Sequence, residues 1–125
     1  MIIGIGTDII EIKRIQRSIQ EYGQDFLKKI YTPPEIEYCK NKANKYQHYA
    51  ARFAAKEAVY KALASGWQQG ISWQDVEVFN EPNGMPQVSI SGKLKKFLST
   101  DKSLKISISH SENYVTCMAI IYKNS

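Results

Sequence analysis

The 125-residue sequence contains no long hydrophobic run, and this absence excludes a large class of protein. No stretch approaches the roughly 20 consecutive apolar residues that a membrane-spanning helix needs. The first residues are apolar only briefly and have no basic lead before them, unlike a secretory signal peptide. We therefore expect a cytoplasmic protein with no membrane partner.

Cysteine is scarce as well. Cys39 and Cys117 belong to no CxxC pair, which argues against a thiolate metal site and favours two free thiols in a reducing compartment. The sequence also has no Walker A motif and no GxGxxG loop, so neither of these glycine-rich phosphate-binding loops is available. We find no internal repeat and no low-complexity linker, and we expect a single domain over residues 1–125.

Acidic residues are outnumbered by basic ones. The chain has 17 lysines and arginines against 12 aspartates and glutamates, which gives a formal charge of +5. A hydrophobic content of 43% and a charged content of 23% are typical of a folded globular domain. The positive excess predicts an anionic partner, which could be a nucleic acid, a phosphorylated metabolite, a membrane surface or an acidic protein.

The first part of the chain predicts a strand followed by helices. β-Branched residues indicate a buried strand over residues 2–8, and isoleucines every third or fourth position indicate a helix over residues 11–21. Thr32, two prolines and Glu35 together are typical of a helix start, and that helix would run to about Asn41.

The rest of the chain predicts a long helix and then strands. The alanine-rich segment 46–65 is the longest helical signal, and Gly66 marks its end. The elements expected after it are a hairpin over 75–91, a short helix over 92–99 and antiparallel strands over 104–111 and 114–122. The predicted fold class is α+β, with one long helix and shorter helices packed on a mainly antiparallel sheet.

An aspartate interrupts the apolar segment GIGTDIIEIKRI. A buried carboxylate costs several kcal/mol unless it has a partner. Asp8 could cap the helix that begins near Glu11, or it could belong to a functional site. The flanking Gly4 and Gly6 indicate that another element approaches this strand closely.

The long helix carries charged residues at helical spacing. In RFAAKEAVYKAL, Glu57 and Lys61 lie four residues apart on one face, and Arg52 and Lys56 repeat that spacing. Glu57 and Lys61 could form an ordinary surface ion pair. Together with Asp8, however, Glu57 could offer the oxygen ligands that Mg²⁺ takes alongside waters and substrate phosphates, with Lys61 holding a phosphate.

Three further features have a structural and a functional interpretation. His110 ends the segment ISISH and could be a hydrogen-bonded turn residue or part of a site. Asn83-Gly84 forms a hairpin turn on either interpretation. Lys13, Arg14 and Arg17 lie off the apolar stripe of the first helix and could be a solvated surface or a docking face.

Four segments together closely resemble the holo-[acyl-carrier-protein] synthase family, the 4′-phosphopantetheinyl transferases of bacterial fatty-acid synthesis. These segments are GIGTDIIEIKRI, RFAAKEAVYKAL, NGMP and ISISHSE, and the resemblance extends from residue 2 to about residue 122. It implies the 4′-phosphopantetheinyl transferase fold and a Mg²⁺-dependent enzyme. Its reaction moves the 4′-phosphopantetheine group of coenzyme A to a serine of apo acyl carrier protein, and adenosine 3′,5′-bisphosphate leaves.

The resemblance also implies catalytic roles. Asp8 and Glu57 match the metal-binding acids of the family. Lys61 matches a lysine near the coenzyme A phosphates, and His110 matches a histidine near the same bound coenzyme. We expect Glu57, directly or through a water on the metal, to be the base that activates the serine. His110 is the other candidate base, because the ordinary pKa of histidine lies near neutrality.

Binding roles and the assembly follow from the same resemblance. Gly84 and Pro86 match the G-x-P turn that lines the coenzyme groove. Arg14 matches the basic position that meets the acidic carrier protein, and Lys13 and Arg17 share its helix face. The family implies a homotrimer with each active site shared between neighbouring subunits, and the charge of +5 suits both anionic substrates.

Two alternatives differ in function. A small basic nucleic-acid-binding module would fit the charge, but the sequence has no helix-turn-helix pattern and no strand lined with aromatic residues, so we expect no nucleic-acid partner. A transferase of relaxed specificity, acting on carrier domains of polyketide or peptide synthases, would usually resemble two fused copies of this domain.

Overall fold

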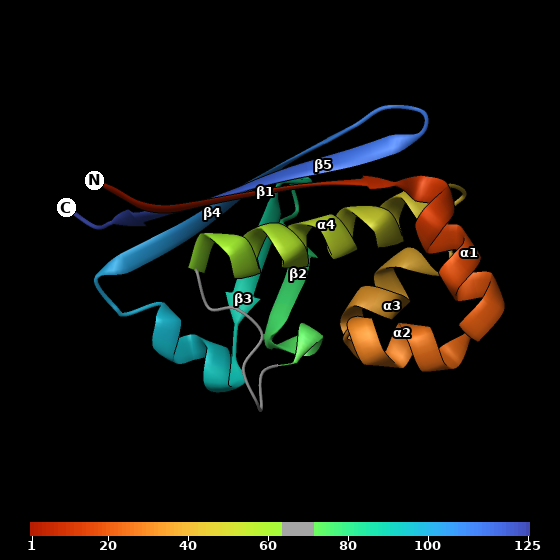
Figure 1. Ribbon diagram of the computed structural model, residues 1–125, viewed down its shortest axis with the longest axis horizontal. Coiled ribbons are helices and arrows are strands. Elements are labelled where there is room, and N and C mark those ends of the chain that lie inside the picture. Colours follow the sequence, from red (N-terminus) through yellow and green to blue (C-terminus); the bar gives the residue numbers. More distant parts are fainter. Residues whose placement is uncertain (64–71) are drawn as a thin grey trace.

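Helix α4 (Lys45–Leu63) lies against one face of a three-stranded antiparallel sheet (Figure 1). The sheet has the order β1-β5-β4, so that β1 (Ile2–Glu11) and β4 (Lys102–His110) are its edges and β5 (Tyr114–Lys123) is its centre. This computed structural model describes residues 1–63 and 72–125. The expected helix end at Gly66 lies outside the described residues.

The remaining elements lie around α4. The short helices α1 (Ile12–Tyr22), α2 (Gln24–Ile30) and α3 (Pro33–Cys39) gather near its N-terminal half (Figure 1). The hairpin of β2 (Val76–Asn80) and β3 (Pro86–Ile90) forms a separate two-stranded sheet. Two 3-10 helices flank this hairpin, η1 (Trp73–Asp75) before it and η2 (Gly92–Phe97) after it.

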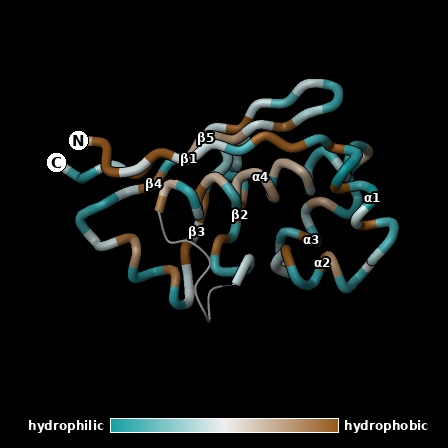
Figure 2. Tube along the Cα trace, viewed as in Figure 1, coloured by the Kyte–Doolittle hydropathy of each residue, from teal (hydrophilic) through white to brown (hydrophobic). Residues whose placement is uncertain are grey.

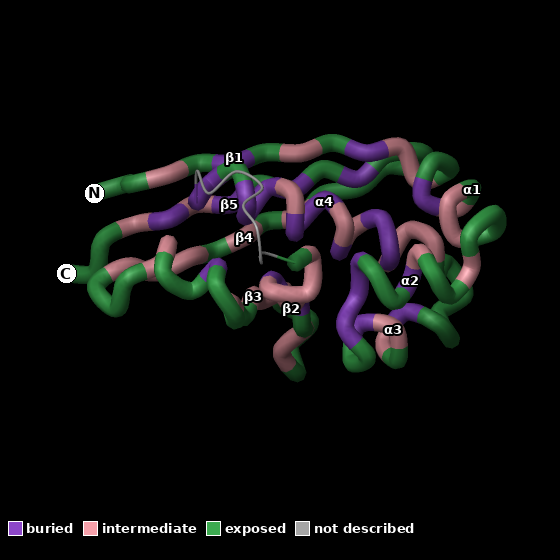
Figure 3. Tube along the Cα trace, turned by 60° about the horizontal axis from the view of Figure 1, so that its bottom comes forward, coloured by how far each residue is buried: buried purple, intermediate pink, exposed green. Residues whose placement is uncertain are grey.

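The small residues of α4 bring it close to β1. Ala54, Ala55 and Ala58 are fully buried, and the buried stretches of α4 follow one another along most of its length (Figure 3). Gly4 and Gly6 of β1 lie directly on this helix, with no room for a Cβ atom on either. The close approach expected from these glycines is therefore confirmed.

The sheet has one covered face and one open face. Residues that alternate inward along β5, from Val115 to Ile121, are buried against α4. On the other face Ile5, Ile9 and Met118 are 57%, 64% and 45% exposed, although hydrophobic residues recur along β1 (Figure 2). The expectation of a buried strand over residues 2–8 holds in the single chain only for the face that α4 covers.

Most other expectations about the elements hold, with shifted ends. The antiparallel strands, the hairpin and the short helix after it are confirmed. Thr32 caps α3 through a capping box with Glu35, but the helix ends at Cys39, before Asn41. Helix α2 was not expected, because its signal is only seven residues long.

Two further findings concern the cysteines and the absence of long hydrophobic runs. Cys39 and Cys117 are free thiols, as expected, and both are buried. Burial raises the pKa of the Cys39 thiol to about 11. In the part of the chain that the structure describes, no helix has both the length and the apolar character needed to cross a membrane.

Candidate active site

Asp8 lies within β1, not at its end. The strand continues to Glu11, and Glu11 is the residue that precedes α1, without a side-chain cap. The interpretation of Asp8 as a helix cap is therefore wrong. Its carboxylate instead meets Lys61 of α4, whose Nζ lies 3.3 Å from Asp8 Oδ1 and donates a 2.9 Å hydrogen bond to the carbonyl oxygen of Thr7.

Glu57 belongs to the same cluster. Burial raises the pKa of the Glu57 carboxyl, and the nearby charge of Asp8 raises it further, while Lys61 and Arg14 act in the opposite direction. The ion pair that the described residues form with Lys61 is to Asp8 and not to Glu57. Helix α4 thus places Glu57 and Lys61 near the carboxylate of Asp8 on β1. This differs from the alternative of a simple surface ion pair between Glu57 and Lys61. We call Asp8, Glu57 and Lys61 the acid-pair cluster.

The acid-pair cluster suits a hard cation. It offers two carboxylates, and Cys117, the partner of Asp8 in the β1–β5 register, stays a neutral thiol because burial and the charge of Asp8 raise its pKa to about 12. Among residues 1–63 and 72–125 no group of three or more histidine, cysteine or acidic side chains could hold a metal by itself. Two carboxylates completed by waters and substrate phosphates are the usual surroundings of Mg²⁺. Asp8 and Lys61 border a cavity of about 580 Å³ that could admit such a substrate.

A second cavity, of about 320 Å³, collects the other expected site residues. Gly84 and Pro86 of the hairpin and His110 of β4 all line it. This juxtaposition was expected only from the resemblance, since the three residues are distant in sequence. The same cavity is lined by side chains that the sequence interpretation left without a role, namely Tyr38, His48, Arg52 and Asn80.

Arg52 is the most informative of these side chains. It is 3% exposed, yet it contacts no carboxylate in the described structure: its Nη2 donates a 2.9 Å hydrogen bond to Asn80 Oδ1, and its guanidinium carbon lies 4.2 Å from the ring centre of Tyr38. Its Nε is buried without a hydrogen-bond partner among the described residues. A buried guanidinium that lines a cavity and pairs with no described carboxylate favours an anionic ligand such as a phosphate.

His48 is the residue that sequence reasoning missed most clearly, because only His110 was considered a plausible site histidine. Both histidines line the second cavity. Burial lowers the pKa of His48, and the charges of Arg52, Lys42 and His110 lower it further. A signal was present in the sequence, since His48 and Arg52 lie four residues apart and therefore share a helix face. We call His48, Arg52, Asn80 and His110 the cationic cavity cluster.

The two clusters lie on different edge strands and border different cavities. Asp8 is on edge strand β1 and His110 is on edge strand β4, with β5 between them. On α4, Arg52 and Glu57 are five residues apart, which places them about 140° apart around the helix axis. The single chain therefore does not bring Lys61 together with Gly84, Pro86 and His110, although all four were expected to contact one coenzyme.

The basic residues of α1 lie near the acid-pair cluster. Lys13, Arg14 and Arg17 are all exposed. Arg14 is close enough to Glu57 to lower its pKa, and Arg17 makes only a long contact, 3.8 Å, with Glu11. Most of this positive charge is thus available to a partner that approaches the acid-pair cluster.

The chain is similar to known proteins along nearly its whole length. Residues 4–119 match the 4′-phosphopantetheinyl transferase superfamily. A holo-[acyl-carrier-protein] synthase of Protochlamydia amoebophila is 53% identical over 120 residues, covering 96% of this chain and 98% of the relative. The crystal structure of a holo-[acyl-carrier-protein] synthase from Neisseria meningitidis matches with a TM-score of 0.86 and 32% identity, over 98% of this chain and 100% of that one.

A related structure contains a ligand. The holo-[acyl-carrier-protein] synthase of Helicobacter pylori, in complex with coenzyme A, matches with a TM-score of 0.82 and 31% identity, over 94% of this chain and 99% of that one. The match to the superfamily spans nearly the whole chain, and so does the likeness to these proteins. The chain therefore belongs to the holo-[acyl-carrier-protein] synthase family of the 4′-phosphopantetheinyl transferase superfamily.

Proposed function

We propose that this protein transfers 4′-phosphopantetheine from coenzyme A to a serine hydroxyl of apo acyl carrier protein. The observation that carries the proposal is the acid-pair cluster, in which two carboxylates and a lysine of β1 and α4 lie near one another, and Asp8 and Lys61 border a cavity. This arrangement supplies what phosphoryl transfer needs: a cation site, a second positive charge and a group that can take a proton. The family membership supports the choice of substrates.

Asp8 and Glu57 would hold Mg²⁺, which when bound neutralises charge on the pyrophosphate. Lys61 would place its ammonium on the leaving phosphate oxygens. The serine oxygen forms a bond to the phosphorus that carries pantetheine, the bond from that phosphorus to the bridging oxygen breaks, and adenosine 3′,5′-bisphosphate leaves. We assign the serine proton to Glu57, because it belongs to the acid-pair cluster, whereas His110 lines the other cavity.

The cationic cavity cluster would bind the phosphorylated nucleotide of coenzyme A. Arg52 brings to this cavity a positive charge that pairs with no carboxylate of the described residues, and His48 and His110 can each add a donor. Gly84 and Pro86 would form the wall of this pocket, since they border the same cavity. The exposed Lys13, Arg14 and Arg17 would receive the acidic carrier protein beside the acid-pair cluster.

We infer a homotrimer, with each active site formed by two neighbouring chains. The placement of the two clusters on different edge strands and in different cavities supports this, because a neighbouring chain would then complete one site from two halves. The exposed isoleucines on the open sheet face offer an apolar surface for the contact.

A mixing experiment tests the shared sites. Asp8→Asn and Arg52→Ala chains, each inactive alone, are refolded together in equal amounts. If each site is formed by two chains, activity should return in the mixture; if each site lies within one chain, the mixture should stay inactive.

The transferase function itself has a direct test. Release of adenosine 3′,5′-bisphosphate from coenzyme A should require the protein, Mg²⁺ and apo acyl carrier protein together. Release without the carrier would indicate a hydrolase, and no release with all components present would contradict the proposal.

A further inference from the structure

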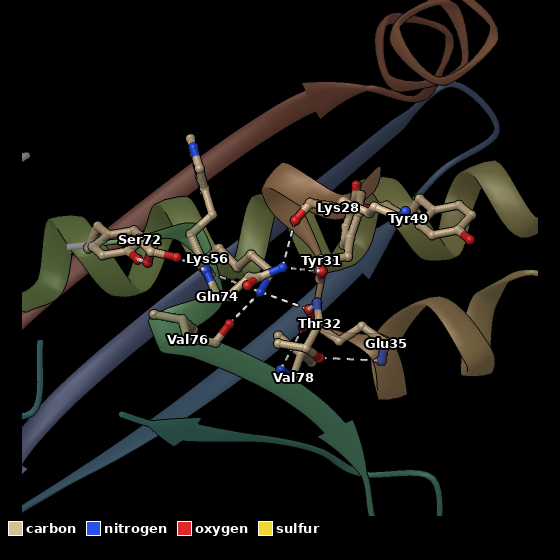
Figure 4. Close-up of polar contacts among 12 residues, drawn as sticks. Lys28, Tyr31, Thr32, Glu35, Tyr49, Lys56, Ser72, Gln74, Val76 and Val78 are labelled. Atoms are coloured by element: carbon tan, nitrogen blue, oxygen red, sulfur yellow. Dashed lines mark hydrogen bonds and ion pairs between the residues drawn. The ribbon is translucent and has the colours of Figure 1, made fainter. Parts of the chain in front are cut away.

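A fully buried ion pair lies in the centre of the molecule, outside both clusters. Lys56 Nζ lies 2.8 Å from Glu35 Oε1, and both side chains are 0% exposed (Figure 4). Lys56 is on α4 and Glu35 is on α3. Neither residue lines the two cavities described above. Burying two charges costs free energy, and the proposed chemistry gives no reason for that cost.

The buried pair also forms hydrogen bonds with the backbone at and near β2. Glu35 accepts hydrogen bonds from the backbone nitrogens of Thr32 and Val78, each at 2.8 Å. Lys56 donates to the carbonyl oxygens of Val76 and, at 3.2 Å, Trp73. The pair therefore fastens β2, the first strand of the hairpin, to α3 and α4 at the same time (Figure 4).

Two further contacts hold the same stretch of chain. Just before β2, the side chain of Gln74 donates to the carbonyl oxygens of Lys28 and Tyr31 at the end of α2 (Figure 4). At the end of β2, Asn80 accepts from Arg52, and its Nδ2 donates to the carbonyl oxygen of Gly84 at 3.1 Å. Strand β2 thus connects the buried pair to the turn at Gly84, which lines the same cavity as the cationic cavity cluster.

Helix α4 contacts β2 with two side chains one helical turn apart. Lys56 holds Val76 inside the core, where its partner Glu35 also holds Val78, and Arg52 holds Asn80 at the cavity. A rotation or shift of the hairpin relative to α4 would break the contacts of Lys56 and would move Gly84 and Pro86 away from Arg52. The hairpin is otherwise a separate sheet, with no strand pairing to the β1-β5-β4 sheet in the described structure.

We propose that Glu35 and Lys56 are positioning residues for coenzyme A: the buried pair sets the hairpin against α4 before the coenzyme binds, so that Gly84 and Pro86 form one wall of the pocket. This inference rests on the proposed function. It predicts an effect on coenzyme binding that is separate from the acid-pair cluster, which is built on β1 and on another face of α4.

The first test is the double variant Glu35→Gln/Lys56→Met, which removes both charges at similar volume and leaves no buried charge unpaired. We expect a folded protein whose KM for coenzyme A rises about tenfold, while kcat and the KM for the carrier protein change less than about twofold. The matched control is Lys40→Met, which breaks the exposed Lys40–Glu37 ion pair of α3 and should leave all three constants unchanged. A folded double variant with an unaltered KM for coenzyme A, or with only kcat lowered, would overturn the proposal.

A second measurement uses the unaltered protein and does not depend on how the variant folds. The Val78 amide should exchange its hydrogen slowly without coenzyme A, as slowly as amides in the middle of α4, because Glu35 already accepts it. Fast exchange that slows only when coenzyme A is added would show that the ligand, not the pair, places the hairpin. If the unaltered protein transfers nothing, the proposed function fails, and slow exchange at Val78 would still establish the hairpin anchor.

Discussion

Gly6 of β1 lies so close to Ala58 of α4 that a Cβ atom on the glycine would be 1.9 Å from the Ala58 carbonyl oxygen. The neighbouring atoms are backbone, so no side chain can move aside. This contact places Asp8, two residues further along the same face of β1, next to Glu57 and Lys61. The acid-pair cluster therefore depends on the absence of a side chain at residue 6.

Gly6→Ala should consequently lower both stability and activity. Overpacking against a rigid backbone costs about 1–3 kcal/mol or more, which we expect to appear as a lower free energy of unfolding in urea. Activity should fall further than stability explains, because β1 must move away from α4. Gln20→Ala, at an exposed position of α1, is the control. A Gly6→Ala protein with unchanged stability would contradict the described contact.

The two carboxylates of the acid-pair cluster should be separately essential. Asp8→Asn and Glu57→Gln each remove a charged ligand, and losing several kcal/mol of charge stabilisation corresponds to a roughly 10²–10³-fold lower kcat. Each variant should also bind Mg²⁺ more weakly in a direct titration. Glu37→Gln, at an exposed acid of α3, serves as the control. Near-normal turnover in either variant would refute the metal assignment.

Metal binding should strengthen as the pH rises. The pKa of Glu57 is raised above its ordinary value, chiefly by burial, so a larger share of Glu57 is protonated in mildly acidic solution than of an exposed glutamate. Mg²⁺ must displace that proton, and its affinity should therefore fall as the pH falls toward the pKa of Glu57. Isothermal titration at several pH values measures this; an affinity independent of pH down to the ordinary range of glutamate would be inconsistent with it.

Binding of coenzyme A should weaken as the pH rises, the opposite of metal binding. The pKa of His48 is lowered by burial and by the neighbouring positive groups, so His48 is mostly neutral near pH 7. A bound phosphate favours the protonated form, and its binding takes up a proton. The KM for coenzyme A should therefore rise with pH, by at most about tenfold per unit for one linked proton. His48→Gln should flatten this dependence, and an equally steep profile in that variant would exclude His48 from the pocket.

Positive charge on α1 should matter for the carrier protein alone. Exposed charge contacts are worth about 0.2–1 kcal/mol each, so Arg14→Ala should raise the KM for acyl carrier protein up to about fivefold, with a weaker salt dependence. The KM for coenzyme A should not change. Lys123→Ala, at the exposed end of β5, is a charge-matched control. If Arg14→Ala lowered kcat and left the carrier KM unchanged, the docking role would be wrong.

Sequence alone was sufficient for the elements whose signals are local. The capping box at Thr32, the hairpin turn at Gly84 and the alanine-rich α4 all follow from short-range patterns, and the structure confirms them. A functional role for Asp8 was predicted through the resemblance, whereas spacing left the helix cap open. The structure excludes the cap because β1 continues past Asp8 to Glu11.

Features that depend on long-range contacts could not be predicted. Lys56 was noted only for its spacing from Arg52, and nothing local shows that it is fully buried against Glu35, 21 positions away. The same holds for His48, whose proximity to His110 is created by the packing of α4 beside β4. The placement of Asp8 and His110 on different edge strands likewise depends on the strand order β1-β5-β4, which no pattern within either strand determines.

The central claim is tested most directly by the intact mass of an apo acyl carrier protein after incubation with this protein, coenzyme A and Mg²⁺. The account predicts that the carrier gains the mass of one phosphopantetheine group, and that EDTA prevents the gain. An unchanged mass, with a carrier that another transferase does modify, would contradict the account.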